Sequence, residues 1–259
     1  MIAVFTGGTG GTKLVQGLQQ IAPPEDLTVV VNTGDDIEWW GLHVSPDIDS
    51  VLYGLSGLLS RERGWGMEDE SFRCLDRMRQ LGQPAWFSLG DLDLATHLTR
   101  TMLLREGKSL SAATAELAAK LGIRARVLPM TDDRVSTVLD TAKGALTLQE
   151  YFVRERHQVD VRAVYFQGAE KARAAQGVIE AIGSAEAVIF APQLGQAGRS
   201  ARRRTMEPEN PPMAPTGALG CHDGNTHPPS FRPRADCPRP NRPAPPPRGR
   251  RSARVGREH

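Results

Sequence analysis

The stretch IAVFTGGTGGTKLVQGLQQIAPPEDLTVVV, residues 2–31, decides the fold class. Residues 2–5 form a short apolar segment that runs directly into a glycine-rich turn. Residues 13–21 space their leucines and isoleucine as one face of a helix, which the prolines after it bring to an end. Residues 27–31 are an apolar, β-branched run, typical of a strand covered on both faces. The order strand, turn, helix, strand predicts a βαβ unit with a right-handed crossover.

The chain beyond this unit continues the alternation of helical and strand-like patterns. Helical spacing predicts a helical insertion at about 67–122, and apolar runs predict further strands after it. The sequence therefore predicts an α/β, Rossmann-like fold with a mostly parallel sheet, occupying residues 1–192. The helices are expected at 72–80, 94–104 and 110–121, and the strands at 125–128, 163–166 and 187–190.

The last 67 residues, 193–259, differ sharply in composition from the rest of the 259-residue chain. They hold 13 of the 19 prolines and 13 arginines but no lysine, and with five acids they carry a net charge of +8. Only four of them are Leu, Ile, Val or Phe, too few to offset the entropy of ordering the backbone. We expect a disordered, basic, Arg/Pro-rich tail. It is either a solvated, non-native or frame-shifted extension or, less in keeping with its lack of interleaved aromatic residues, a nucleic-acid-binding segment.

The composition as a whole favours a cytoplasmic protein. The formal charge is only +2, and no apolar run approaches the length that spans a bilayer. The N-terminus lacks the features of a signal peptide. Three cysteines without metal spacing indicate reduced thiols and no disulfide framework.

The glycine-rich turn is the first candidate binding element. Glycines here let the backbone approach a ligand, and the helix that follows offers free N–H groups and the positive end of its dipole to a phosphate. The turn is not a P-loop, and Lys13 stands where a dinucleotide fingerprint needs its third glycine. A tight turn without a ligand is the alternative. The candidate phosphate-binding residues are Gly7, Gly8, Thr9, Gly10, Gly11 and Lys13.

Acidic strings follow the glycine turn along the chain. Asn32, Asp35 and Asp36 come directly after the second strand, at the edge where open α/β sheets bind ligands. Carboxylates there can accept ribose hydroxyls or hold Mg²⁺ against phosphates. In the string SPDID, the two carboxylates Asp47 and Asp49 suit a divalent cation or a helix N-terminus. Asp49 could be the N-cap of the next helix, and this role does not exclude ligand binding.

Two further loops complete the predicted crevice. WFSLGDLDLATH, which begins at Trp86, brings two acids and His97 to a helix start, although a lone helical histidine is more often structural. PMTDDRVST, which begins at Pro129, is predicted as a polar loop whose Asp132 lines the crevice, unless it serves as an ordinary turn. All these loops follow strands or precede helices, so we expect them to converge on one edge of the sheet.

Together, the strings FTGGTGGTKLVQGL, VVVNTGDD, GLHVSPDIDSVLY, RGWG, LGDLDLATHLTR and VLPMTDDRVSTVL resemble the 2-phospho-L-lactate transferase family, which makes the deazaflavin cofactor coenzyme F-420. The resemblance covers about residues 1–192. It implies a cytoplasmic, usually dimeric, Mg²⁺-dependent enzyme. The donor would be a guanosine diphosphate-linked lactyl phosphate or its enolpyruvyl equivalent, the acceptor the terminal ribityl hydroxyl of the deazaflavin Fo, and the leaving group GMP.

The resemblance also implies roles for individual residues. The turn from Gly7 to Lys13, with Asn32 and Asp132, would bind the nucleotide and its phosphates. Asp49 would contact Fo and the metal region, and Ser88, where many relatives carry lysine, would be a second acceptor-binding position. Asp35 and Asp49 are the expected metal ligands, and Asp49 and Asp36 the expected catalytic acids.

Three alternatives remain beside this interpretation. A sugar-nucleotide-binding regulatory module shares the superfamily, and an NAD-dependent dehydrogenase shares the βαβ start. The third is an inactive truncated product, because after Pro192 the chain departs from the family pattern, which continues for roughly another hundred residues of sheet and helix.

Overall fold

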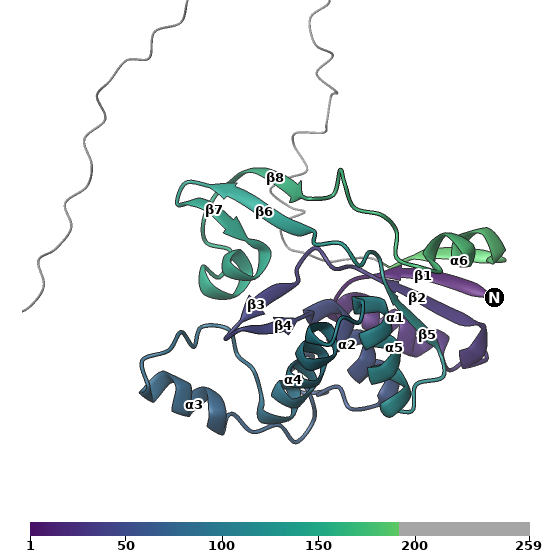
Figure 1. Ribbon diagram of the computed structural model, residues 1–259, viewed down its shortest axis with the longest axis horizontal. Coiled ribbons are helices and arrows are strands. Elements are labelled where there is room, and N and C mark those ends of the chain that lie inside the picture. Colours follow the sequence, from purple (N-terminus) through teal and green to yellow (C-terminus); the bar gives the residue numbers. More distant parts are fainter. Residues whose placement is uncertain (192–259) are drawn as a thin grey trace, which may run out of the picture. The chain divides into compact units, whose positions relative to one another are not determined.

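The computed structural model describes residues 1–191, and its centre is a parallel sheet (Figure 1). Within these residues the sheet has the strand order β5-β2-β1-β9, and every neighbouring pair is parallel. The central pair aligns Val4 with Val29, both fully buried. Continuous apolar strands of this kind are what a sheet with two covered faces requires. The predicted α/β fold class and the opening βαβ unit are therefore confirmed.

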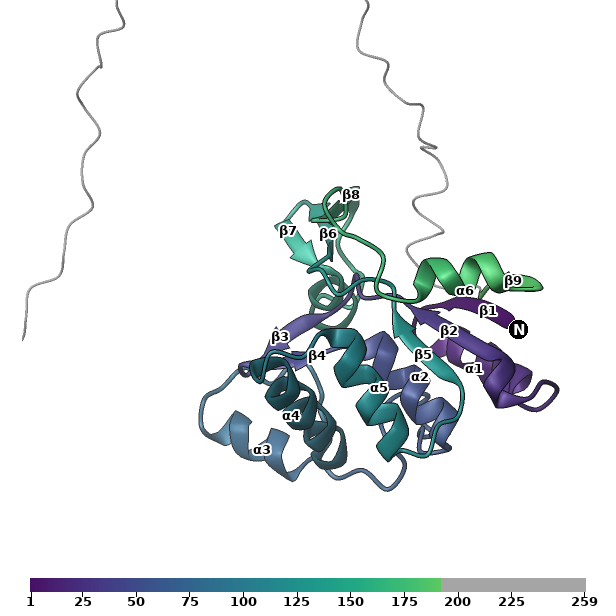
Figure 2. The same cartoon turned by 45° about the vertical axis from the view of Figure 1, so that its right-hand side comes forward.

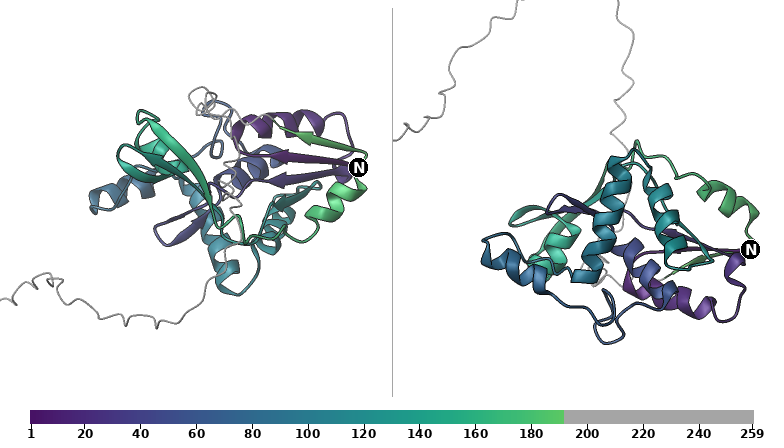
Figure 3. Two further views of the ribbon diagram at one scale, coloured as in Figure 1. Left: turned by 90° about the horizontal axis from the view of Figure 1, so that it is seen from above. Right: turned by 60° about the horizontal axis from the view of Figure 1, so that its bottom comes forward.

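Helices cover both faces of this sheet (Figure 2). Apolar side chains of α1, α2 and α5 pack on one face in the largest core cluster, which includes Val15, Leu52 and Leu117. A smaller cluster joins Val30 of β2 to Val178 of α6 on the other face. α4 lies beside α5, as the right-hand view of Figure 3 shows. The three predicted helices at 67–122 thus exist, and the last of them, α5, packs on the sheet through β5.

Two small antiparallel sheets, which the sequence analysis did not predict, accompany the parallel one. β3 and β4 form a hairpin, and β7, β6 and β8 form a three-stranded sheet. The predicted strand at 163–166 belongs to this second sheet, as part of β8. The stretch predicted as a polar loop after Pro129 ends earlier than expected, because β6 begins at Ser136.

The first helix is displaced from its predicted position. It begins at Thr9 rather than at Lys13 and ends at Leu18, so two of the glycines of the turn lie in its first turn. Ile21, expected on its apolar face, is 81% exposed beyond the helix end. The glycines concealed the helix start because their low helical propensity resembles that of a loop.

The predicted tail, 193–259, lies outside the described residues. Within the described part of the chain, the helices are too short or too polar to cross a membrane. The elements in chain order are β1 (Ile2–Thr6), α1 (Thr9–Leu18), η1 (Pro24–Asp26), β2 (Leu27–Val31), β3 (Ile37–Trp39), β4 (Leu42–Val44), α2 (Pro46–Ser56), α3 (Arg73–Gln80), α4 (Asp91–Arg105), α5 (Leu110–Lys120), β5 (Arg126–Pro129), β6 (Ser136–Thr141), β7 (Gly144–Thr147), η2 (Glu150–Arg154), β8 (Val161–Gln167), α6 (Val178–Ser184) and β9 (Ala187–Phe190).

Candidate active site

A cavity of about 780 Å³ lies at the edge of the sheet where the strands β1 and β2 end. One part of its wall is the start of α1, and carboxylates from the loop after β2 and from α2 and α4 form another. Gly10 and Asp49, which the sequence analysis placed in one crevice, both line this cavity. The expected convergence of loops on one edge of the sheet therefore occurs.

The glycine turn owes its shape to two close approaches. A Cβ on Gly8 would lie 2.6 Å from Oδ1 of Asp47, and a Cβ on Gly11 would collide with the hydroxyl of Thr6. A side chain at Gly8 would displace the carboxylate of Asp47, and one at Gly11 would displace Thr6. Glycine at both positions thus lets α1 begin directly against β1 and α2. The first-turn N–H groups of α1, which a helix leaves without intrahelical partners, accordingly stand at the cavity wall.

Not every predicted residue of this turn reaches the cavity. Gly8, Thr9, Gly10 and Gly11 line it, whereas Gly7 is buried beneath it. Lys13 is exposed on α1 and is absent from the cavity wall. The phosphate-binding role of Lys13 stays a prediction.

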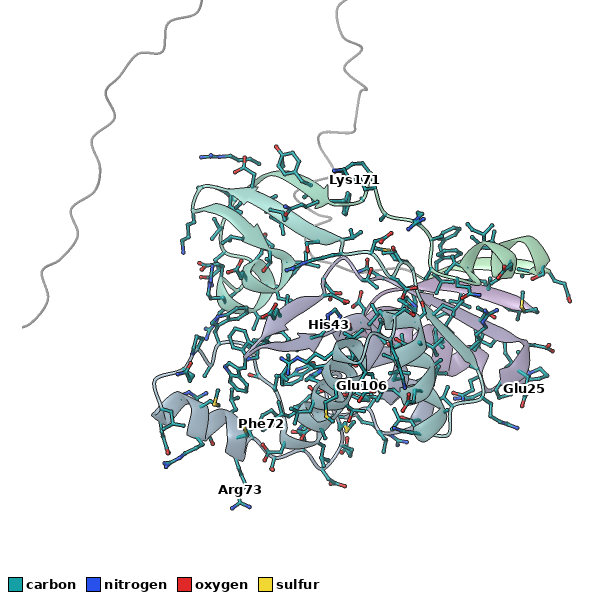
Figure 4. All side chains as sticks on the ribbon, in the orientation of Figure 1. Glu25, His43, Phe72, Arg73, Glu106 and Lys171 are labelled. Atoms are coloured by element: carbon teal, nitrogen blue, oxygen red, sulfur yellow. The ribbon has the colours of Figure 1, made fainter. Side chains whose placement is uncertain are left out.

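Asp35, Asp36 and Asp47 form what we call the rim cluster. Asn32 donates a hydrogen bond to Asp47 (2.9 Å) and Gln149 donates one to Asp35 (3.0 Å). Asp36 lies behind the cavity wall and contacts Ser45 and, at 3.0 Å, the imidazole of His43, which Figure 4 labels. The Oδ1 atoms of Asp35 and Asp36 are buried and have no hydrogen-bond partner among residues 1–191.

Burial and mutual repulsion govern the protonation of the rim cluster. Burial raises the pKa of Asp35 well above its ordinary value, and the charges of Asp47 and Asp36 raise it further. Burial likewise raises the pKa of Asp47 to about 6, against the opposing hydrogen bond from Asn32. The pKa of Asp36 is raised by burial, and His43 counteracts part of that rise. A nearby cation stabilises the charged form of crowded, desolvated carboxylates of this kind.

Asp49, Asp93, His97 and Arg100 form a second group, the helix cluster, which joins α2 to α4. Both Nη atoms of Arg100 bind Asp49, with Nη1 3.2 Å from Oδ2. His97 stands between the two acids, with Nδ1 3.5 Å from Asp49 and Nε2 3.2 Å from Asp93. Tyr53 donates a 2.6 Å hydrogen bond to Asp93. Burial tends to raise the pKa of Asp93, but its contacts with His97 and Tyr53 outweigh burial and lower it.

The structure excludes one of the predicted uses of Asp49. α2 begins at Pro46, with Ser45 in the N-cap position, so the capping interpretation of Asp49 is wrong. Asp49 sits one turn inside α2, where its side chain reaches Arg100 instead of the helix N-terminus. Its carboxylate lines the cavity, as does Asp35.

An aromatic part of the wall faces the polar groups. Trp65, Phe87, Phe152 and Phe166 line the cavity, and they come from loops, from η2 and from β8. Ser88, the predicted acceptor-binding residue, lies among them. Planar aromatic surface beside a phosphate-sized glycine turn suits a ligand that combines a ring system with a phosphate.

Asp132 is a further predicted site residue that lies outside the cavity wall. It accepts hydrogen bonds from the backbone N–H and the hydroxyl of Ser111 at the start of α5, and it does not line the cavity. From the same stretch it is Thr137 that reaches the wall. Binding of the nucleotide by Asp132 stays a prediction.

The sequence analysis missed Arg100 and Gln149. A signal for Arg100 was present, because Asp93, His97 and Arg100 recur at intervals of four and three and so share one face of α4. No comparable pattern marks Gln149, whose contact with Asp35 spans 114 residues of sequence.

Comparisons with known proteins point to one family. Residues 2–193 match the family described as 2-phospho-L-lactate transferase CofD. The phosphoenolpyruvate transferase of Streptomyces griseus subsp. griseus is 46% identical over 196 residues, which are 74% of this chain and 62% of that protein. The 2-phospho-L-lactate transferase of Methanosarcina mazei is 42% identical over 189 residues, 73% of this chain and 62% of that one.

Among solved structures, a UPF0052-family protein of Bacillus halodurans matches with a TM-score of 0.49 and 18% identity, over 74% of this chain and 58% of that one. The chain spans about three fifths of the length of the curated relatives it matches.

Proposed function

The chain belongs to the 2-phospho-L-lactate transferase CofD family, and from that premise we propose that its cavity transfers a phospholactyl or phosphoenolpyruvyl group to the deazaflavin Fo. The donor is linked to guanosine diphosphate and GMP is released, as a step in coenzyme F-420 biosynthesis in the cytoplasm. The observation that carries this proposal is the shared cavity of Gly10, Asp35 and Asp49. Residues 1–192 are, in this proposal, an incomplete transferase domain, and the full-length form is a homodimer.

The donor fits the glycine end of the cavity. Backbone N–H groups at the start of α1 bind phosphate oxygens, and the helix dipole adds to their attraction. The carboxylate of Asp47 lies against Gly8, and the next residues at the helix start, Thr9 and Gly10, line the cavity. A diphosphate held there lies on the same cavity wall as Asp35 and Asp47.

The rim cluster fits Mg²⁺. Asp35 and Asp36 each have a buried oxygen without a hydrogen-bond partner in the described residues, and burial raises the pKa of both. Hard carboxylate oxygens are the ligands that Mg²⁺ takes in phosphate-handling enzymes. Asp35, with Asp36 and Asp47 beside it, would hold the ion, and whether Asp49 joins them stays a prediction. An Mg²⁺ ion held by these residues would supply charge neutralisation for the diphosphate.

The acceptor Fo fits the part of the cavity wall that aromatic side chains line. The ring system of Fo packs against side chains such as Trp65 and Phe87, and its hydroxyl side chain extends toward Ser88 and Asp49. A carboxylate at Asp49 can accept the hydrogen bond of the attacking hydroxyl and take its proton as the bond to phosphorus forms. The transfer is an in-line displacement, so positioning and charge neutralisation supply most of the catalysis.

The test measures binding and turnover separately. The purified chain is titrated with Fo and with GDP in the presence of Mg²⁺, and then incubated with Fo and each donor while GMP release is followed. Binding of both ligands with formation of phosphorylated Fo supports the proposal. Binding without turnover identifies an inactive truncated form, and binding of a UDP-sugar with none of Fo favours the regulatory module.

A further inference from the structure

The side chain of Arg100, in α4, is completely buried. The residue is 0% exposed, and it reaches Asp49 across 51 residues of sequence. Removing a guanidinium from water is costly, and a buried ion pair is often no more stabilising than apolar residues of the same size. Fold stability alone therefore does not account for an arginine at this position.

The geometry of the pair has a definite effect on Asp49. Two parallel contacts, from Nη1 to Oδ2 and from Nη2 to Oδ1, fix the plane of the carboxylate as one contact cannot. Lysine has a single charged nitrogen and does not reproduce this fork. His97 limits movement on the other side, with Nδ1 3.5 Å from Oδ2 of Asp49. The carboxylate that lines the cavity is thus held from behind by α4.

We propose that Arg100 is a positioning residue for the transfer reaction: through its two-point contact it aims the carboxylate of Asp49 at the hydroxyl of the acceptor. This inference rests on the proposed function. Arg100 itself does not line the cavity, and so it acts on the acceptor through Asp49. Tyr53 and Asp93 support the arrangement by holding His97 and α4 in place behind the same carboxylate.

A double-mutant cycle tests this role. Arg100→Met, Asp49→Asn and the double variant are compared with wild type by kcat and KM for Fo and for the donor, and by titration of Fo without donor. We expect R100M to lower kcat/KM for Fo about 100-fold, the loss typical of a displaced catalytic group, and to leave the donor KM unchanged. In the D49N background the same change should have less than about a twofold effect, because coupled residues are not additive.

Controls separate positioning from folding. Arg105→Met removes an exposed arginine from the same helix and should match wild type in every measurement. R100K, which keeps the charge and loses the fork, should give an intermediate loss at wild-type helicity by circular dichroism. If R100M does not fold, R100K and the D49N/R100M variant, which leaves neither charge unpaired, decide the question.

The outcomes are distinct. Equal losses from R100M in the wild-type and D49N backgrounds, or an unchanged kcat/KM for Fo, overturn the positioning role and leave the proposed function intact. A wild-type chain that binds no Fo overturns the proposed function and this inference with it.

Discussion

The rim cluster and the helix cluster place carboxylates on the wall of the same cavity, yet they neutralise charge in opposite ways. In the helix cluster, Arg100 lies against Asp49, so the negative charge has a partner from the chain itself. In the rim cluster, Asp35 and Asp36 receive hydrogen bonds from neutral groups and a histidine, and burial raises the pKa of both. Arg100 thus neutralises Asp49 within the folded chain, whereas a cation from solution would offset the unfavourable burial of Asp35 and Asp36.

The largest effect is expected from removing the charge of Asp35. Asp35→Asn should lower the transfer rate by about a thousandfold and abolish the Mg²⁺ dependence, since the metal then loses a central ligand. GMP release at several Mg²⁺ concentrations measures this. Asp76→Asn, on the exposed surface of α3, is the matched control and should behave as wild type. A D35N protein with unchanged Mg²⁺ dependence would show that the rim cluster is not the metal site.

Removing a carboxylate charge should change the free energy of unfolding in opposite directions in the two clusters. In the metal-free protein, Asp49→Asn leaves Arg100 buried without its charge partner and should destabilise by about 3 kcal/mol. Asp35→Asn instead relieves repulsion with Asp47 and should stabilise the metal-free protein. Urea denaturation of both variants in EDTA measures the two free energies of unfolding. If both substitutions changed the free energy of unfolding in the same direction, the proposed difference between the two clusters would be wrong.

The sequence predicted one of these clusters better than the other. Asp35 and Asp36 follow the strand 27–31 directly, and the ends of parallel strands meet at one edge, so topology alone brought them to the site. Arg100 lies in the middle of a helix, and its partner, Asp49, comes from a different helix 51 residues earlier in the sequence. Helical spacing reveals which residues share a face but not what that face contacts.

Prediction of the fold from the sequence likewise succeeded only where burial leaves a clear pattern. The continuous apolar strands 2–5 and 27–31 identified the parallel sheet, because burial on both faces leaves few polar residues. β6 and β7 were not predicted because these strands are partly exposed, and their buried and exposed residues do not alternate regularly. The helix α1 was misplaced because glycines needed for close packing, such as Gly11, lower the helical signal where they occur.

The smallest expected effect is a pH dependence of stability. The folded pKa of Asp47 is about 6, above its unfolded value, so the folded state binds the proton more tightly. Stability of the metal-free protein should therefore fall as the pH rises from 5 to 7.5, by about 1 kcal/mol from Asp47 alone. Thermal unfolding in EDTA across this range measures it. Saturating Mg²⁺ should reduce the fall, and a stability that rises with pH would contradict the raised pKa values of the rim cluster.

The close packing of α1 against α2 makes a position outside the cavity sensitive to substitution. A Cβ on Gly54 would collide with the methyl group of Thr12, so glycine at this position lets the two helices pack closely. One of these helices begins at the glycine turn and the other at the SPDID string. The spacing between the glycine turn and the carboxylates of α2 therefore depends on a missing methyl group two turns away. Under the proposed function, a substitution at Gly54 would impair the transfer although Gly54 does not line the cavity.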